Sequence, residues 1–231
     1  MLWPKPNCLI IDPADGLTDA NRWAESSGNG LHALPGAAYA APAYGLAPGP
    51  SGALYILAGG TANYNATLPL WFYASAPTTG MTVCLVQKFT APAASDFIFS
   101  SVNPGVTRGL AVDFSTADRL RIRAYDAAGA VMTCTMTADG PLTGRTRVIV
   151  LAMEQAGSLA RAWVDREGVA ATFAGSLNPI AYDAVVVPTL FSIVGGAGNY
   201  DDGNCYTVQI DNRVWSDSEA RAFSAFWMDR I

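Results

Sequence analysis

The sequence is poor in the residues that carry most enzyme chemistry. Charged residues make up only 14% of the 231 residues, lysine occurs only at Lys5 and Lys88, and the single histidine is His32. Glutamate occurs at four positions: Glu25, Glu154, Glu167 and Glu219. A chain with so few candidate acids, bases and metal ligands has little material for catalysis.

The motifs of common hydrolases and metalloenzymes are also missing. None of the four glutamates has an aspartate two residues later, so the E-x-D-x-x-E carboxylate pair of a glycosidase is absent. There is no G-x-S-x-G elbow, no phosphate-binding P-loop and no cysteine–histidine cluster for zinc. His32 lies in a glycine-rich stretch without a nucleophile motif. We therefore predict that the protein is not an enzyme.

Positive charge and long apolar runs are scarce as well. The net charge of −5 and the pI of about 4.7 argue against binding to nucleic acid or to an anionic membrane surface. No run of 18 apolar residues is present, so no membrane insertion is expected. The first residues lack the basic stretch and apolar core of a signal peptide, which predicts synthesis in the cytoplasm.

The four cysteines, Cys8, Cys84, Cys134 and Cys205, are far apart and form no C-x-x-C pair. Cys84 and Cys134 lie within apolar runs, where buried free thiols are expected. A Cys8–Cys205 disulfide remains the alternative.

What the chain does contain indicates an all-β fold. Hydrophobic residues make up 51%, enough for a large core, while 22 glycines and 14 prolines spread turns along the whole chain. Short apolar or alternating segments between these turns predict about ten strands, typical of a sandwich or barrel. The predicted strands are 53–57, 81–86, 97–100, 110–114, 119–125, 131–136, 147–153, 160–165, 169–173, 190–194 and 206–212.

The organisation predicted is a single domain over residues 1–231. One domain is expected because no linker divides the chain. Residues 1–50 are expected to be irregular, with 1–22 as an N-terminal extension. One helix is expected at the end, where Ser216 and Glu219 form a capping box. Its apolar stripe predicts packing onto the sandwich: Ala220, Phe223, Phe226 and Trp227.

An arginine row stands out in the segment 119–125. Leu120, Ile122 and Ala124 alternate with the polar series, so one face is buried and the other faces water. That other face carries Arg119, Arg121, Arg123 and Tyr125. Successive arginines would lie about 7 Å apart, a spacing that suits an acidic polysaccharide bound by planar guanidinium groups. The alternative is a solvated face paired with aspartates of a neighbouring strand.

Aromatic residues in turn-rich segments are further candidates for sugar binding, because a flat ring can cover the C–H face of a pyranose. The candidate sugar-binding residues of this kind are Tyr64 and Tyr200. For each of them, ordinary packing within the fold is the alternative.

A calcium site is a candidate at the loop Asn199 to Asn204. Asp201, Asp202 and Asn204 supply hard oxygen ligands around a glycine, and Asp113 is a further candidate ligand. The alternative is a hairpin turn that uses Asn and Asp for their backbone tolerance.

Four segments in order resemble the concanavalin A-like lectin/glucanase superfamily, in its laminin-G-like branch. They are Trp23 to His32 (WAESSGNGLH), Ala53 to Gly60 (ALYILAGG), Ala162 to Gly168 (AWVDREG) and Val208 to Glu219 (VQIDNRVWSDSE). The resemblance runs from about Trp23 to the C-terminus and implies an antiparallel two-sheet jelly-roll. It also implies that a sugar binds on the concave face or its rim.

The function expected is therefore non-catalytic binding of carbohydrate. The lysine-poor, Gly/Ala-rich chain without a signal peptide resembles structural proteins of phage-like particles. We expect an adhesin on a virion or gene transfer agent, a head spike or fibre that binds host capsule or surface polysaccharide as a homo-oligomer among other particle subunits. The alternatives are a structural decoration or fibre-assembly module and an atypical glycoside hydrolase.

Overall fold

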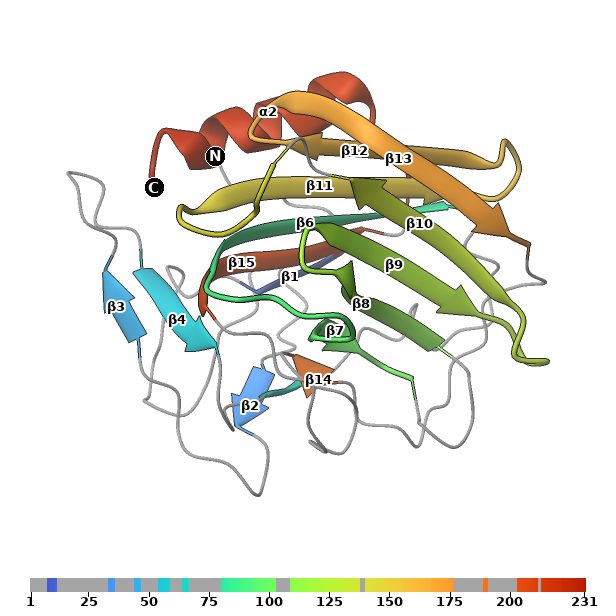
Figure 1. Cartoon of the computed structure of the whole chain (residues 1–231), viewed down its shortest axis with the longest axis horizontal. Coiled ribbons are helices and arrows are strands. Elements are labelled where there is room, and N and C mark those ends of the chain that lie inside the picture. Colours follow the sequence, from blue (N-terminus) through green and yellow to red (C-terminus); the bar gives the residue numbers. More distant parts are fainter. Residues whose placement is uncertain are drawn as a thin grey trace.

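A computed structural model of the chain describes residues 80–102, 109–137, 140–176, 190, 203–211 and 213–231, and gives the course of the strands outside these ranges (Figure 1). The strands are β1 (Cys8–Ile11), β2 (Ala33–Pro35), β3 (Tyr44–Leu46), β4 (Leu54–Ala58), β5 (Tyr64–Ala66), β6 (Gly80–Phe89), β7 (Phe97–Ser100), β8 (Gly109–Thr116), β9 (Arg119–Tyr125), β10 (Val131–Thr137), β11 (Arg147–Glu154), β12 (Leu159–Val164), β13 (Glu167–Gly175), β14 (Thr189–Leu190) and β15 (Gly203–Asp211). The helix α2 (Asp217–Met228) follows them.

These strands form two antiparallel sheets joined by β13. The helix-side sheet contains β12, β11, β6, β15, β4 and β3, with β1 on β15, and the arginine-side sheet contains β10, β9, β8, β7, β14, β5 and β2. Strand β13 pairs with β12 over Glu167–Val169 and with β10 over Ala170–Gly175, so it leaves one sheet and enters the other. The predicted antiparallel sandwich with one C-terminal helix is confirmed.

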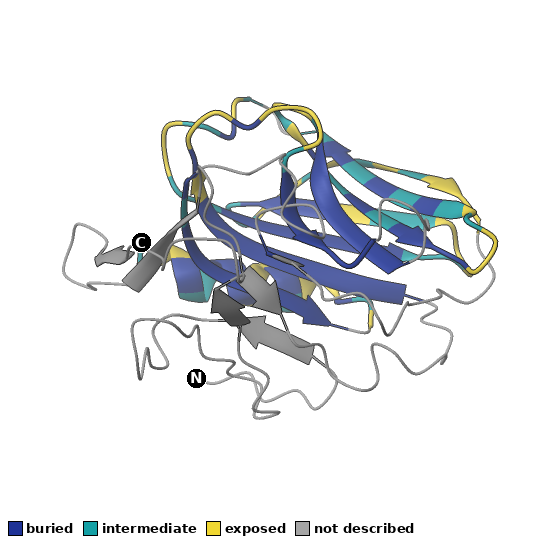
Figure 2. Cartoon of the chain, turned by 90° about the horizontal axis from the view of Figure 1, so that it is seen from below, coloured by how far each residue is buried: buried dark blue, intermediate teal, exposed yellow. Residues whose placement is uncertain are grey.

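The main core lies between the two sheets. Alternate residues of the arginine-side sheet point into it, including Val112, Ile122 and Cys134, and they meet Leu85 and Leu151 of the helix-side sheet. Each of these side chains is at most 1% exposed. Figure 2 shows the central strands buried along most of their length and the exposed residues gathered at turns and sheet ends. The period of two in β9 therefore predicted the buried face correctly.

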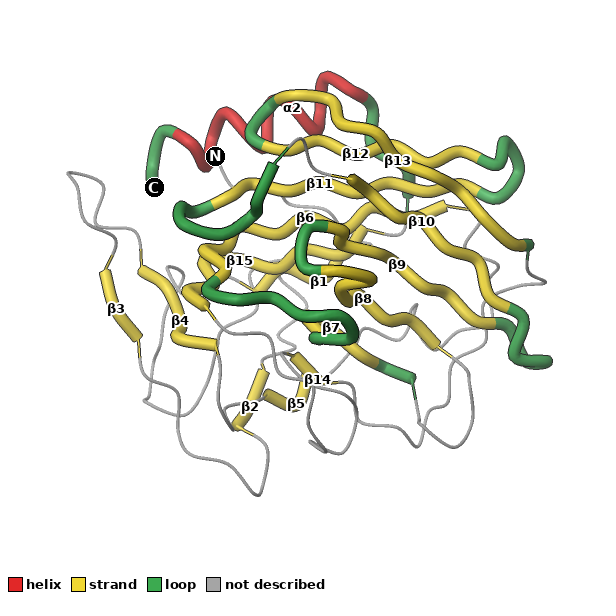
Figure 3. Tube along the Cα trace, in the orientation of Figure 1, coloured by secondary structure: helices red, strands yellow, loops and turns green. Residues whose placement is uncertain are grey.

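A second apolar layer lies on the other face of the helix-side sheet. Cys84 and Val86 of β6 belong to it, while Val83 and Leu85 of the same strand face the main core, so β6 is covered on both sides as its sequence predicted. Helix α2 supplies the cover and runs along this sheet (Figure 3). Trp215, just before the helix, is fully buried in this layer.

The helix begins at the predicted capping box. The Ser216 hydroxyl accepts a hydrogen bond from the Glu219 backbone N–H at 3.3 Å, and the Glu219 carboxylate accepts one from the Ser216 N–H at 2.9 Å. Three residues of the predicted stripe, Ala220, Phe223 and Trp227, are buried, while Phe226 is half-buried. Capping and stripe together fix where the helix begins and which side faces the sheet.

The capping glutamate makes stability depend on pH. The guanidinium of Arg213 donates to Glu219 at 2.6 and 3.1 Å and holds the pKa of this carboxyl at about 2, below its usual 4.5. Its stabilisation is full above about pH 4.5 and is lost as the pH falls through about 2, because the unfolded chain binds the proton more tightly. Glu219→Gln should therefore reduce the loss of stability between those pH values, measured as the urea midpoint at each pH. The matched change Glu167→Gln alters an exposed glutamate, and identical curves for Glu219→Gln and wild type would contradict the assignment.

Several sequence predictions need correction. Residues 1–50 were predicted to be irregular, yet β1, β2 and β3 lie there. Asp165 was placed at the end of a strand but lies in the turn between β12 and β13. Cys205 forms no disulfide, so the alternative of a Cys8–Cys205 disulfide is wrong. Cys84 and Cys134 are buried and form no disulfide, as predicted, and burial raises the pKa of Cys134 to about 12. Residues 191–194 of the predicted strand 190–194 lie outside the described residues.

Candidate functional site

The face of the arginine-side sheet that points away from the core is called here the arginine face. Strand register sets a row across it, with Phe97 opposite Asp113, Asp113 opposite Arg121, Arg121 opposite Thr135 and Thr135 opposite Thr172. A second row brings Arg123 beside Thr133. Each of these two arginines therefore lies beside a threonine of the neighbouring strand, at the spacing between strands of about 4.8 Å.

Three residues form an ion cluster at the centre of the arginine face, and we call it the arginine cluster: Asp113, Arg121 and Arg123. Arg121 donates to Asp113 through Nε at 3.0 Å and Nη2 at 2.7 Å, and Arg123 donates through Nη2 at 2.6 Å. The Asp113 side chain is fully buried, whereas the arginine side chains are 24% and 22% exposed. The hydrogen bond to Asp113 raises the pKa of Arg121. Two cations on one carboxylate leave the cluster with a net charge of +1.

Aromatic rings hold the second arginine of the cluster in place. The Arg123 guanidinium lies 5.6 Å from the Phe97 ring centroid and 6.0 Å from that of Tyr125. Its Nη1 donates to the Tyr125 hydroxyl at 3.0 Å. Cation–π contacts and charged hydrogen bonds together fix this side chain before any ligand arrives.

The alternative kept open for the arginine row, pairing with an aspartate of a neighbouring strand, describes Arg121 and Arg123. Arg119 remains exposed at the start of β9, and its guanidinium makes no hydrogen bond or ion pair within the described part of the chain. Tyr125 was expected to face water, but its contacts leave it only 8% exposed. Asp113 was a candidate calcium ligand, and this was wrong because two guanidinium groups occupy its carboxylate.

The other predicted site residues fall mostly outside the described residues. This holds for Tyr200, Asp201 and Asp202, while Tyr64 begins β5 without a described side chain. Asn204 is half-buried in β15, opposite Lys88 and Leu57. Among the residues that the structure does describe, no group of three or more His, Cys, Asp or Glu is close enough to hold a metal ion. Calcium at this loop remains a prediction.

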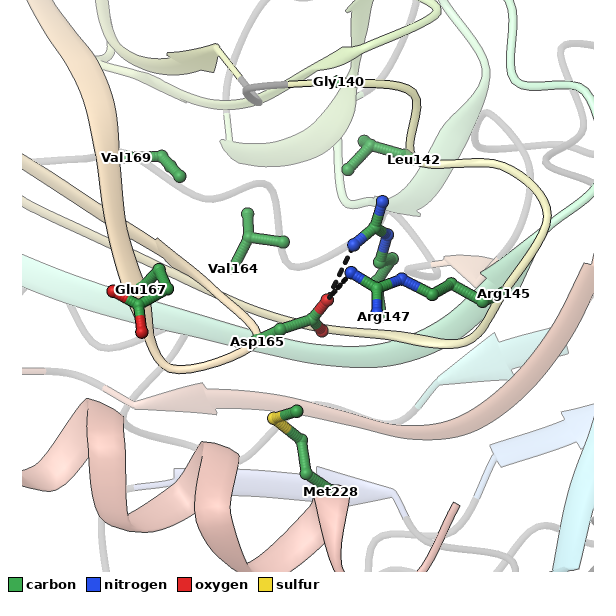
Figure 4. Close-up of a pocket in the computed structure, with 9 residues that line it drawn as sticks. All are labelled: Gly140, Leu142, Arg145, Arg147, Val164, Asp165, Glu167, Val169 and Met228. Carbon is green, nitrogen blue, oxygen red and sulfur yellow. Dashed lines mark hydrogen bonds and ion pairs between the residues drawn. The ribbon is translucent and has the colours of Figure 1, made fainter.

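A depression of about 440 Å³ lies where the loop before β11, the β12–β13 hairpin and the end of α2 meet (Figure 4). Its charged lining residues are Arg145, Arg147, Asp165 and Glu167, and its apolar ones are Leu142, Val164, Val169 and Met228. The volume lies within the range of about 300–1,000 Å³ typical of small-molecule sites. The sequence analysis did not predict this site, because its residues come from three separate segments.

Asp165 organises the charged side of the depression. Its Oδ2 accepts from Arg147 at 2.7 Å and lies 3.1 Å from Nη2 of Arg145, and its Oδ1 accepts from the Val148 N–H at 2.9 Å. The side chains of Asp165 and Arg147 are 13% and 14% exposed, whereas that of Arg145 is 66% exposed. The inner pair is therefore part of the framework, and Arg145 extends it to the surface.

Two carboxylates, Asp165 and Glu167, line this depression, which raises the question of catalysis. A glycosidase needs one carboxyl group as acid and another as base or nucleophile, both free to meet the substrate. Both oxygens of Asp165 are already engaged by two guanidinium groups and a backbone N–H. The arrangement offers one exposed carboxylate, Glu167, for contact with a ligand, which suits binding better than hydrolysis.

Comparison with known proteins identifies similar folds but no family. No protein family matches the sequence, and no curated protein is similar to it in sequence. The binding domain of botulinum neurotoxin DC, solved with rat synaptotagmin II, has 9% identity and a TM-score of 0.67 over 94% of this chain and 51% of its own. A structure from work on cell entry of botulinum neurotoxin type C, which depends on two ganglioside molecules, matches with 9% identity and a TM-score of 0.67 over 94% and 50%.

The receptor-binding domain of botulinum neurotoxin type G is similar too, with 11% identity and a TM-score of 0.64 over 96% of this chain and 52% of its own. The chain thus spans about half the length of these domains. At such low identity the likeness establishes a shared β-sandwich fold. The assignment to the concanavalin A-like superfamily remains a resemblance in sequence. Within the described residues, no helix is long and apolar enough to cross a membrane.

Proposed function

We propose that this domain binds carbohydrate without catalysing a reaction, and that the arginine face is the surface that holds an acidic glycan. The observation that carries this proposal is the arginine cluster, in which a buried carboxylate fixes two partly exposed guanidinium groups and leaves a surplus positive charge. Fixed cations lose little conformational freedom when an anionic ligand binds.

The unused donors of the cluster suit anionic groups of a polysaccharide. Arg121 uses its Nε and Nη2 for Asp113, and its Nη1 has no partner among the described residues. Arg119 adds a second exposed cation on the same strand, and Thr133, Thr135 and Thr172 provide hydroxyl groups beside them. Carboxylate or sulfate groups on the glycan would meet the arginines, and sugar hydroxyls would meet the threonines.

The similar folds support a ligand of this kind. Cell entry of botulinum neurotoxin type C depends on ganglioside, a carbohydrate-bearing lipid, and a related domain is named as a receptor-binding domain. Because this chain spans about half of those domains, glycan binding by this half is part of the proposal. Because a fold alone does not determine function, the support comes from the binding roles named for these similar domains.

The biological setting that we propose is the surface of a phage-like particle, where the domain would act as a homo-oligomeric adhesin for capsule or surface polysaccharide of the host. Its support is the lysine-poor, Gly/Ala-rich composition. Many weak sites on one particle would give strong attachment through avidity.

Binding to an acidic polysaccharide should weaken when the free donors of the arginine face are removed. We expect Arg119→Ala and Arg121→Lys each to weaken binding by up to about tenfold at low salt, because a lost charge-assisted hydrogen bond is worth roughly 1.4 kcal/mol. Arg119→Ala should also reduce the salt dependence of the affinity. Lysine at position 121 keeps a charge beside Asp113 and so preserves the fold. A glycan array followed by titration at several salt concentrations measures both effects.

The matched control is Arg161→Ala, which removes an exposed arginine from β12 in the other sheet. It should leave affinity and salt dependence unchanged. Equal losses in Arg119→Ala and Arg161→Ala, which each remove one positive charge, would reduce the effect to net charge and remove the arginine face from the proposal. A chain that binds no glycan but forms oligomers in size-exclusion chromatography would favour the assembly-module alternative.

A further inference from the structure

The depression at the end of the sandwich is separate from the arginine face, and we infer that it is a second binding site, for one acidic sugar residue. The ligand class is a pyranose that carries a carboxylate, such as a uronic acid. This inference rests on the proposed carbohydrate binding but uses other residues and another surface. Charge, apolar lining and rigidity each support it.

The cationic rim has one guanidinium more than the framework needs. The Asp165 carboxylate already accepts hydrogen bonds from Arg147 Nη1 at 2.7 Å and from the Val148 N–H at 2.9 Å. Its charge and both of its oxygens are therefore satisfied without Arg145. Arg145 nevertheless lies beside the same carboxylate, 66% exposed, with its Nε and Nη1 unpaired among the described residues. An anionic group of a ligand can therefore bind to the open side of Arg145.

The opposite rim has the reverse charge. In Figure 4, Glu167 lies on the other side of Asp165 from the two arginines. An exposed carboxylate accepts hydrogen bonds from hydroxyl groups and repels a second anion. A ligand that fits both rims has its negative charge at one end and hydroxyl groups at the other.

Apolar side chains line the depression between the two charged rims. Leu142, Val164 and Val169 lie at the margin of the core, and Met228 of α2 completes the lining. Met228 is 38% exposed, the one large hydrophobic side chain so exposed within the described residues. A polarizable thioether can pack on the C–H face of a sugar ring. An inorganic anion would leave this part uncovered, and a lipid chain would bring hydrocarbon against four charged groups.

The hairpin that carries Asp165 and Glu167 is held rigidly. Asp165 and Arg166 both have positive φ angles, 51° and 79°, in a two-residue turn that glycine or asparagine would adopt more easily. The Arg166 carbonyl accepts from Arg221 of α2 at 2.8 Å, and its guanidinium donates to the Ala225 carbonyl at 3.3 Å. Such a turn persists where its surroundings fix it, so the site exists before a ligand binds.

The test is a titration of the isotope-labelled full chain by NMR with two matched probes, methyl β-glucuronide and methyl β-glucoside, which differ by the carboxylate. We expect the glucuronide to bind about tenfold more tightly, with shifts around the depression. In the shifts around the depression, Arg145→Ala should abolish this preference, since the glucuronide then binds there as weakly as the glucoside. Met228→Ala should weaken both probes to a similar degree. Both side chains are exposed enough for the variants to keep the fold.

Controls separate this inference from the proposal for the arginine face. In the NMR shifts around the depression, Arg119→Ala and Arg161→Ala should leave both titrations unchanged, because neither residue lines it. If wild type binds the two probes equally, or if Arg145→Ala keeps the preference, the inference is wrong even where a polysaccharide still binds in an Arg119-dependent manner. If the glucuronide depends on Arg145 while no polysaccharide responds to Arg119→Ala, the depression stands and the arginine face fails.

Discussion

Replacing Asp113 by alanine is expected to lower the free energy of unfolding by about 3–5 kcal/mol, measured by urea denaturation. The carboxylate has no exposed surface, and among the described residues it is the one anion paired with two guanidinium groups that are only 24% and 22% exposed. Without it, Arg121 and Arg123 would remain close together as unpaired, half-buried cations. The loss comes from the charges left behind more than from the bonds removed.

A surface ion pair provides the comparison. Asp229 lies 3.3 Å from Arg166, but its side chain is 74% exposed, so Asp229→Ala should change stability by less than about 1 kcal/mol. The double variant Asp113→Ala/Arg121→Ala should lose less than the sum of its single changes, because it removes a cation together with its partner. A loss below about 1 kcal/mol for Asp113→Ala would mean that the cluster is solvated and does not support the sheet.

Trp215→Ala should be similarly severe, with a loss of about 3–5 kcal/mol by the same measurement. The indole is fully buried between α2 and the helix-side sheet, with its ring centroid 5.6 Å from that of Phe223. Its Nε1 also donates to Asp211 at 2.6 Å. Truncation would leave a cavity and remove a donor from a carboxylate that is 1% exposed. We expect α2 to dock poorly, with loss of near-UV circular dichroism.

Two variants separate the contributions of Trp215. Trp215→Phe keeps most of the apolar volume but not the N–H, so it should lose about 1–3 kcal/mol, in part offset by Arg213, whose Nε stays 3.2 Å from Asp211. Met228→Ala changes an exposed residue of the same helix and should stay within about 0.5 kcal/mol of wild type. If Trp215→Ala matched Met228→Ala, the helix would contribute little to the stability of the sandwich.

Much of the fold could be predicted from local patterns. The alternation in β9, the apolar run of β6 and the capping box at Ser216 each report on a few neighbouring residues, and each prediction is confirmed. The short strands within residues 1–50 were missed because each has only three or four residues, too few to show a clear alternation. Such strands form through pairing with distant partners, as β1 does with β15.

The partner of the arginine row could not be predicted because of one irregularity in register. In a regular hairpin, the Thr116–Arg119 pair would place Asp113 opposite Ile122, on the strand face that points to the core. A bulge between Phe114 and Thr116 shifts the register by one residue, so Asp113 lies opposite Arg121 instead. A shift of one residue exchanges the two faces of a strand, and no local sequence pattern predicted this bulge.

Strand β13, which pairs with β12 at its start and with β10 at its end, has a mechanical consequence. One continuous backbone crosses from one sheet to the other. The two sheets therefore cannot separate along that side without breaking the hydrogen-bond ladders at both ends of β13. We therefore expect the two described sheets to unfold together as one cooperative unit. Substitutions in the arginine cluster on one outer surface and at Trp215 under α2 on the other would then lower the stability of the same unfolding transition.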